Sequence, residues 1–209
     1  MSTSKPRRRK ARAAVGAVDR SRRSGGGGAF VTPPTVSRKT LLDGGSDHRF
    51  RGLVHDLLTI AARMEMVREH HGRRMGISGP QYSVLMAVAR LQNEGGASVG
   101  GVAQALHVSS AFVAAETGKL ARRRLLLKQP NPDDRRGVLL SVAPAGRLAI
   151  DRCAAEIRAI NDMFFGELDT QAFGALCEAA ATLVDGSRKA VRYLTAVDED
   201  ARVALRAAG

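Results

Sequence analysis

Residues 125–142 have the sequence LLLKQPNPDDRRGVLLSV, where the pattern of apolar residues changes. An apolar run from Leu125 to Gln129 is followed by a charged, turn-rich segment from Pro130 to Gly137 and by a second apolar run from Val138 to Val142. Two apolar runs around a turn-rich loop, here about eight residues long, are typical of a β-hairpin. Helical spacing returns at Pro144, so we expect one hairpin in an otherwise helical chain.

Helices are expected on the N-terminal side of this hairpin. Apolar residues recur at helical spacing over 46–71, which predicts a long amphipathic helix. A second helix begins at Ser78, which forms the Ser-x-x-Gln pattern of a capping box with Gln81. Ser98 and Ser109 are suitable N-cap residues for two shorter helices.

Two longer helices are expected after the hairpin, one from Pro144 and one after Asp169. Three consecutive helices followed by a hairpin form a winged helix-turn-helix. The predicted fold is therefore mostly α with a small β-hairpin wing, flanked by N- and C-terminal dimerisation helices. These flanking helices are too apolar to be solvated alone, and pairing with the same helices of a second chain would bury them.

The chain divides into three expected regions. Residues 1–45 form a disordered basic N-terminal tail, 46–197 form the folded domain with its DNA-binding part at about 78–142, and 198–209 form a C-terminal tail. The first of these has eleven basic and two acidic residues, and so carries +9 of the net charge of +13. Such a tail is either a solvated extension or a mobile arm that contacts phosphates, and composition does not separate the two.

Composition and motifs argue against several classes of protein. The only cysteines, Cys153 and Cys177, lie in apolar helical stretches, so we expect core packing, with redox sensing as the alternative. His70 and His71 are adjacent and point about 100° apart on a helix, an arrangement that chelates metals poorly. We find no nucleophile elbow, phosphate loop or metal-ligand cluster, and expect no catalysis, no metal and no cofactor.

No apolar stretch approaches the roughly 18 residues of a membrane span, and the N-terminus does not resemble a secretory signal. We therefore expect a cytoplasmic, nucleoid-associated protein with no membrane partner.

The second helix of the helix-turn-helix is expected in the major groove of double-stranded DNA. Val113, Thr117 and Leu120 would face inward. The candidate DNA contacts on this helix are Ser109, Ser110, Phe112, Ala114 and Lys119. The alternative is an ordinary helix pair in a bundle.

The tip of the hairpin is the more specific signal. A charged tip has no packing role, whereas an arginine there fits the narrow, electronegative minor groove. Asp134, Arg135 and Arg136 are the candidates, with the aspartate pairing one arginine and leaving the other for DNA. The alternative is a merely solvated loop.

Residues 46–195 resemble the MarR family of bacterial regulators. The resemblance rests on ISGPQYSVL at 77–85, VSS at 108–110 and DDRRG at 133–137. The family's wing signature is Asp-x-Arg, five residues, then Leu-Thr; Asp134 and Arg136 match it. The resemblance implies a homodimer, usually a repressor, released from a palindromic operator by a small, often aromatic, anionic ligand.

Three departures from the family pattern matter. Ala143 replaces a threonine, so the following helix loses its N-cap hydroxyl. Arg124 occupies the place of a common glycine just before the first strand. The recognition helix is poor in polar base readers, with Ala114 and Ala115 facing outward, which raises the share expected from DNA shape and wing contacts.

The resemblance places a ligand pocket between the first long helix, the second and the fifth. Arg51 and His55 lie one helical turn apart and could bind a carboxylate. The candidate residues are Arg49, Arg51, His55, Met66 and Tyr82. The alternative is a solvated helix face. No cysteine precedes Cys153, which argues against the family's peroxide-sensing branch.

Two functional hypotheses within DNA binding remain open. The first is a ligand-responsive repressor. The second is a nucleoid-type or architectural protein that uses its basic tail and has no small-molecule effector. A repressor prefers its operator over random DNA by a factor of about 10³ or more, and an architectural protein does not.

Overall fold

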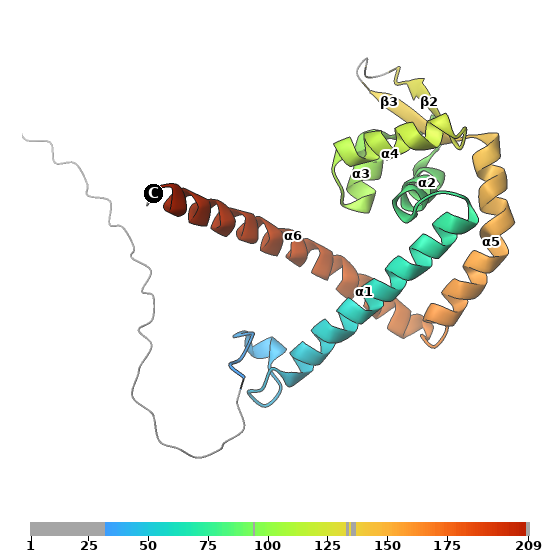
Figure 1. Ribbon diagram of the computed structural model, residues 1–209. Coiled ribbons are helices and arrows are strands. Elements are labelled where there is room, and N and C mark those ends of the chain that lie inside the picture. The colour runs from blue at the N-terminus through green and yellow to red at the C-terminus, as the bar shows by residue number, and fades with distance from the viewer. Residues whose placement is uncertain (1–31, 94, 133, 135–136, 208–209) are drawn as a thin grey trace, which may run out of the picture. The chain divides into compact units, whose positions relative to one another are not determined.

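The computed structural model describes residues 32–93, 95–132, 134 and 137–207, and side chains up to residue 200. The chain divides into two compact units, Met1–Leu53 and Val54–Gly209. The described elements, labelled in Figure 1, are η1 (Lys39–Leu41), α1 (His48–Arg74), α2 (Gly79–Leu91), β1 (Ala97–Ser98), α3 (Val99–Leu106), α4 (Ser110–Arg122), β2 (Leu126–Pro130), β3 (Val138–Val142), α5 (Pro144–Phe165) and α6 (Thr170–Ala207). This confirms the predicted, mostly helical fold with a small β wing.

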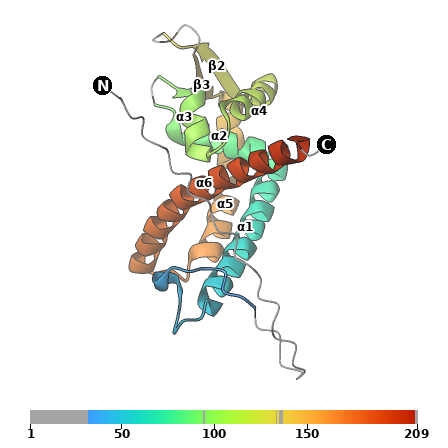
Figure 2. The ribbon, with the colours of Figure 1, turned by 90° about the vertical axis from the view of Figure 1, so that its left-hand side faces the viewer.

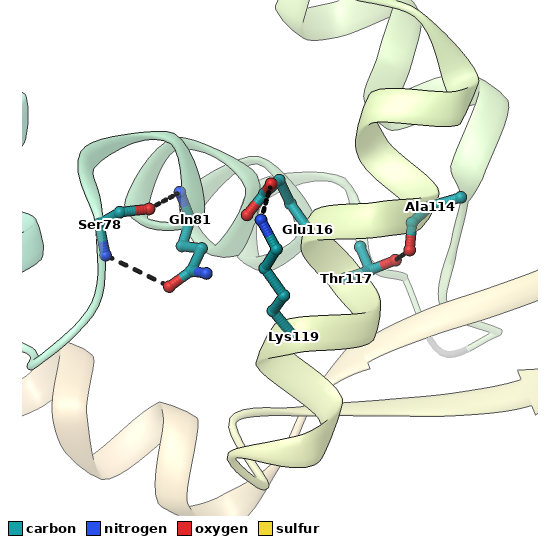
Figure 3. Close-up of polar contacts among 6 residues, drawn as sticks. All are labelled: Ser78, Gln81, Ala114, Glu116, Thr117 and Lys119. Carbon is teal, nitrogen blue, oxygen red and sulfur yellow. Dashed lines mark hydrogen bonds and ion pairs between the residues drawn. The ribbon is translucent and has the colours of Figure 1, made fainter.

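The predicted N-caps are confirmed. The Ser78 hydroxyl accepts a hydrogen bond from the backbone of Gln81 at 3.4 Å, and the Gln81 side chain accepts one from the backbone of Ser78 at 3.2 Å (Figure 3). Ser98 caps α3 and Ser109 caps α4 in the same way, at 3.0 and 3.1 Å. Each such cap stabilises its helix by about 1 kcal/mol. As expected, Ala143 gives α5 no side-chain cap.

One hydrophobic core lies between α2, α3, α4 and the sheet, which Figures 1 and 2 show gathered together. Its largest fully buried side chains are Val84, Leu85, Val88, Val102, Val113, Thr117, Leu120, Leu126 and Leu140. Every element of the helix-turn-helix contributes to this core. The orientation of each helix is therefore fixed by close packing rather than by loops.

The sheet differs from the expected two-stranded hairpin. β2 and β3 pair antiparallel, as predicted for a hairpin, and the structure places Leu126 opposite Val142. The short strand β1 adds a third strand in the order β1-β3-β2, with Ala97 opposite Leu140. β1 has only two residues, and the second, Ser98, is also the N-cap of α3. A strand this short has no alternating pattern by which sequence could reveal it.

The chain ends also differ from the expected boundaries. Helix α6 continues to Ala207, through most of the segment expected to be a C-terminal tail. In the N-terminal unit, residues 32–45 include η1 and a bridge between Asp43 and Ser46. Of the predicted basic tail, residues 1–31 lie outside the described residues.

Asp47 organises the described part of the N-terminal unit. Its side chain is buried, and it accepts hydrogen bonds from the backbone and the hydroxyl of Thr35, both at 2.7 Å. Arg51 pairs with it at 2.9 Å. The hydrogen bonds from Thr35, and after them the charge of Arg51, hold the pKa of Asp47 below its ordinary value.

No helix among the described residues combines the length and the apolar character needed to cross a lipid bilayer.

Arg124 lies in the left-handed region, with φ of 59°, where the chain turns from α4 into β2. Its backbone N–H donates to Ala121, and that of Leu125 donates to Leu120, which ends the helix. A left-handed conformation costs a residue with a side chain roughly 1–2 kcal/mol. The glycine expected here from the family pattern would avoid that cost.

We predict that Arg124→Gly raises the free energy of unfolding by about 0.5–1 kcal/mol, because relief of backbone strain outweighs the greater freedom of glycine in the unfolded chain. The matched control is Arg123→Gly, since Arg123 has an ordinary φ of −85°. The control should lower stability by about 0.5–1 kcal/mol. Denaturant titrations of both variants measure the difference. A loss of stability in both would contradict the argument.

Candidate nucleic-acid interface

Helix α4 has one buried and one exposed side. Val113, Thr117 and Leu120 are completely buried, as predicted. The candidate DNA contacts on this helix are all exposed: Ser109, Ser110, Phe112, Ala114 and Lys119. The turn before α4 is tight because His107 ends α3 in the left-handed conformation and Ser109 then caps α4. The structure thus supplies the helix-turn-helix geometry, while DNA contact by these residues stays a prediction.

An ion pair that sequence reasoning missed engages Lys119. The ammonium group of Lys119 donates to the carboxylate of Glu116 at 2.6 Å (Figure 3). Glu116 is only 7% exposed, whereas the lysine side chain is about half exposed. The spacing of three residues on a helix is the sequence signal for such a pair. A phosphate contact by Lys119 would have to share this ammonium group with Glu116.

A cluster of exposed basic residues lies where α4 ends and β2 begins. We call it the basic cluster, and it comprises Arg122, Arg123, Arg124 and Lys128. The signal for it is the unbroken arginine run 122–124. Contacts with phosphates come mainly from such residues, and they position a protein on DNA without reading its sequence.

The wing is closed by backbone hydrogen bonds at its loop. Asn131 donates to Gly137 at 3.0 Å, and Gly137 donates to Asp134 at 2.8 Å. Asp134 is exposed. Arg135 and Arg136, the two predicted minor-groove candidates, lie outside the described residues. Their roles therefore stay predictions.

The five candidate ligand residues have different surroundings. Arg49 and Arg51 belong to the N-terminal unit, where Arg51 is paired with Asp47. His55 is exposed on α1. Met66 is 70% exposed and lines a hollow of about 510 Å³ together with Glu69, His70 and Ile160, among others. Tyr82 is half-buried against His71 instead, with their ring centres 5.3 Å apart.

Polar contacts join α1 to α5 beside this hollow. The carboxylate of Glu156 contacts His70 at 2.8 Å and Arg74 at 2.9 Å. The hydrogen bond from His70, and then that from Arg74, lower the pKa of Glu156 below its ordinary value. The hollow is lined by two acidic residues as well as basic ones, so its charge does not by itself favour an anion.

His71 is buried next to this contact. Neither of its ring nitrogens has a hydrogen-bond partner among the described residues. Burial, and after it the neighbouring charge of His70, lowers the pKa of His71, so the ring is neutral at pH 7. Among the described residues, no group of three histidine, cysteine, aspartate or glutamate side chains is placed to hold a metal ion.

A protein-family model described as the MarR family matches residues 75–137, from just before α2 to the start of β3. No curated protein matches the chain at a significant level. The chain is similar in fold to several solved structures, among them three from Pseudomonas aeruginosa, Bordetella bronchiseptica and S. aureus.

The first is a probable transcriptional regulator from Pseudomonas aeruginosa, which is 25% identical to the chain, with a TM-score of 0.50, covering 62% of this chain and 96% of that one. The second is BpsR of Bordetella bronchiseptica, with 24% identity, a TM-score of 0.52 and coverages of 63% and 91%. MepR of S. aureus, in complex with DNA, has 14% identity, a TM-score of 0.55 and coverages of 64% and 96%.

The family match spans the helix-turn-helix and reaches the wing, which are the elements that the structure packs around one core. The solved structures share the fold around it. Residues 75–137 are thus similar to the MarR family, and the chain shares the winged helix-turn-helix fold of these solved structures.

Proposed function

We propose that the protein is a homodimeric, sequence-specific repressor that binds a palindromic operator in duplex DNA and is released by a small aromatic or anionic ligand. One observation carries the DNA-binding part of the proposal: α4 is held on the core by one side and is exposed along the other. The basic cluster at its end supplies phosphate contacts, and the wing follows directly.

The flanking helices support the homodimer. Helix α6 is 38 residues long, and among its described side chains only that of Val184 is partly buried; the others are exposed. Leu183 is 51% and Tyr193 is 71% exposed, and Met163 on α5 is 76% exposed. Apolar helix faces of this extent are not stable in water and mark an interface. A second copy supplies the same apolar faces, and a two-fold pair fits a palindromic operator.

The ligand part of the proposal is supported by a similarly folded protein and by two side chains of α1. The DNA binding of the similarly folded BpsR is regulated by 6-hydroxynicotinic acid, an aromatic carboxylate. On this chain, the exposed His55 and the partly exposed Arg51 on α1 are the candidate carboxylate partners.

We predict that the wild-type protein sediments at about twice its 22.2 kDa mass at micromolar concentration. Leu176→Glu combined with Leu183→Glu should give monomers with a lower melting temperature, because both side chains are exposed apolar groups on α6. The matched control is Lys189→Glu, a charge change at an exposed polar position of the same helix. A wild-type chain that stays folded as a monomer would contradict the proposal.

A binding titration tests the DNA-binding part. The full chain should prefer duplexes that it enriches from a random pool by about 10³-fold over random DNA at physiological salt. Arg136→Ala should weaken this binding by about 1–3 kcal/mol without changing the melting temperature, because the proposed contact is with DNA alone. Arg158→Ala, an exposed arginine of α5, is the matched control and should bind normally. Equal affinity for enriched and random DNA would favour the architectural alternative.

Thermal melting in the presence of benzoate or 6-hydroxynicotinate tests the ligand part. A ligand that binds only the folded state should add about 2.7 kcal/mol of stability at 100 times its dissociation constant, and should release DNA. Arg51→Ala with His55→Ala should abolish both effects. Because Arg51 also pairs with Asp47, His55→Ala is measured alone as well. A response that survives in all of these variants would place the ligand site elsewhere.

A further inference from the structure

The polar side chains in the middle of α4 are unavailable to DNA. Between Ala111 and Gly118, only Glu116 and Thr117 are polar. Glu116 is nearly buried and binds the ammonium group of Lys119, as Figure 3 shows. Thr117 is completely buried, and its hydroxyl donates to the backbone carbonyl of Ala114 at 3.1 Å. Neither side chain presents a hydrogen-bonding group on the exposed side of the helix.

The exposed side of the first turns of α4 is apolar. Ala111, Ala114 and Ala115 are exposed, and Phe112 has 36% of its surface exposed. Phe112 is the only large apolar side chain of α4 that is exposed in this way, since the described α4 residues Val113 and Leu120 are buried. The N-terminal half of a recognition helix is the part that contacts base edges in the major groove. The groups in position there are methyl groups and one phenyl ring, together with the Ser110 hydroxyl.

These apolar groups match one feature of the major groove. Base edges in this groove present hydrogen-bond donors and acceptors and a single apolar group, the C5-methyl group of thymine. A phenyl ring placed against a donor or acceptor would remove water from it without replacing the hydrogen bond, which is unfavourable. The same ring placed against a methyl group buries apolar surface on both sides.

We infer that α4 recognises its operator through contacts of Phe112 and the neighbouring alanines with thymine C5-methyl groups, so that each half-site is selected by the positions of its thymines. This inference rests on the proposed DNA-binding function and names the chemistry by which it selects sequence. The basic cluster binds phosphates of any sequence, so affinity and selection come from different parts of the same surface.

The test uses the full-length protein and duplexes that it enriches from a random-sequence pool. Each thymidine of an enriched half-site is replaced in turn by deoxyuridine, which removes only the C5-methyl group and keeps every hydrogen-bonding group. In a parallel series, adenine is replaced by 7-deazaadenine, which removes the N7 acceptor. Both series are titrated with the wild type and with Phe112→Ala, and melting temperatures confirm that the variant is folded.

With the wild type, the dissociation constant should rise about fourfold for each contacted methyl group that is lost, the factor that corresponds to about 0.8 kcal/mol for one buried CH₂. The 7-deazaadenine series should change little. With Phe112→Ala, at least one deoxyuridine position should lose its effect, because the ring that contacted that methyl group is gone. Leu127→Ala, an exposed apolar change on β2, is the matched control and should keep the full deoxyuridine effect.

Two results would count against the inference, and they are distinguishable. If enriched duplexes bind equally well with deoxyuridine and lose affinity with 7-deazaadenine, the protein selects sequence but not through thymine methyl groups. If no duplex is enriched from the pool, the proposed DNA-binding function fails, and the inference fails with it.

Discussion

The burial of Val113, Thr117 and Leu120 on one side of α4 is the constraint on which the rest of the functional surface depends. Side chains of a helix keep fixed angles to one another, so fixing the inner side also fixes the outer side. The core that holds these residues includes side chains from α2, α3 and the sheet. The exposed residues of α4 therefore have their positions before any DNA arrives, and binding does not have to order them.

The C-terminal helix α6 contrasts with this core. The helix-turn-helix and the sheet bury most of their large apolar residues within one chain, whereas the described part of α6 exposes nearly all of its own. Within a single chain, the helix-turn-helix therefore has a buried core, but the described apolar residues of α6 stay largely exposed to water. In the proposed homodimer, a second copy buries the apolar faces of α6 and doubles the proposed DNA-contacting surface. Two recognition helices on one face of a duplex are spaced by about one helical turn, roughly 34 Å.

Local signals in the sequence predicted most of the fold. The caps at Ser78, Ser98 and Ser109 follow from short-range spacing, and the buried side of α4 follows from helical periodicity. The strand β1 could not be predicted, because two residues show no alternation and the strand exists only through its partner β3. The left-handed conformation of Arg124 was foreseeable only as a position where the family pattern has glycine.

The candidate site was less predictable than the fold. Exposure of the α4 residues followed from periodicity, but the pairing of Lys119 with a nearly buried Glu116 depends on how deeply α4 packs. The ligand candidates were chosen from shared helix faces and a resemblance. The structure gives them separate surroundings, because Arg51 binds Asp47 and Tyr82 packs against His71. Pairings of this kind depend on tertiary contacts that spacing along one helix does not reveal.

We propose that the exposed side of α4 and the wing form the DNA-contacting surface. Amide hydrogen exchange of the full-length protein, with and without an enriched duplex, tests it most directly. We expect slower exchange on DNA binding in residues 109–124 and in the hairpin 126–142, with little change in the exposed part of α6. Protection confined to residues 1–45, with α4 and the hairpin unchanged, would contradict it and assign DNA binding to the basic tail.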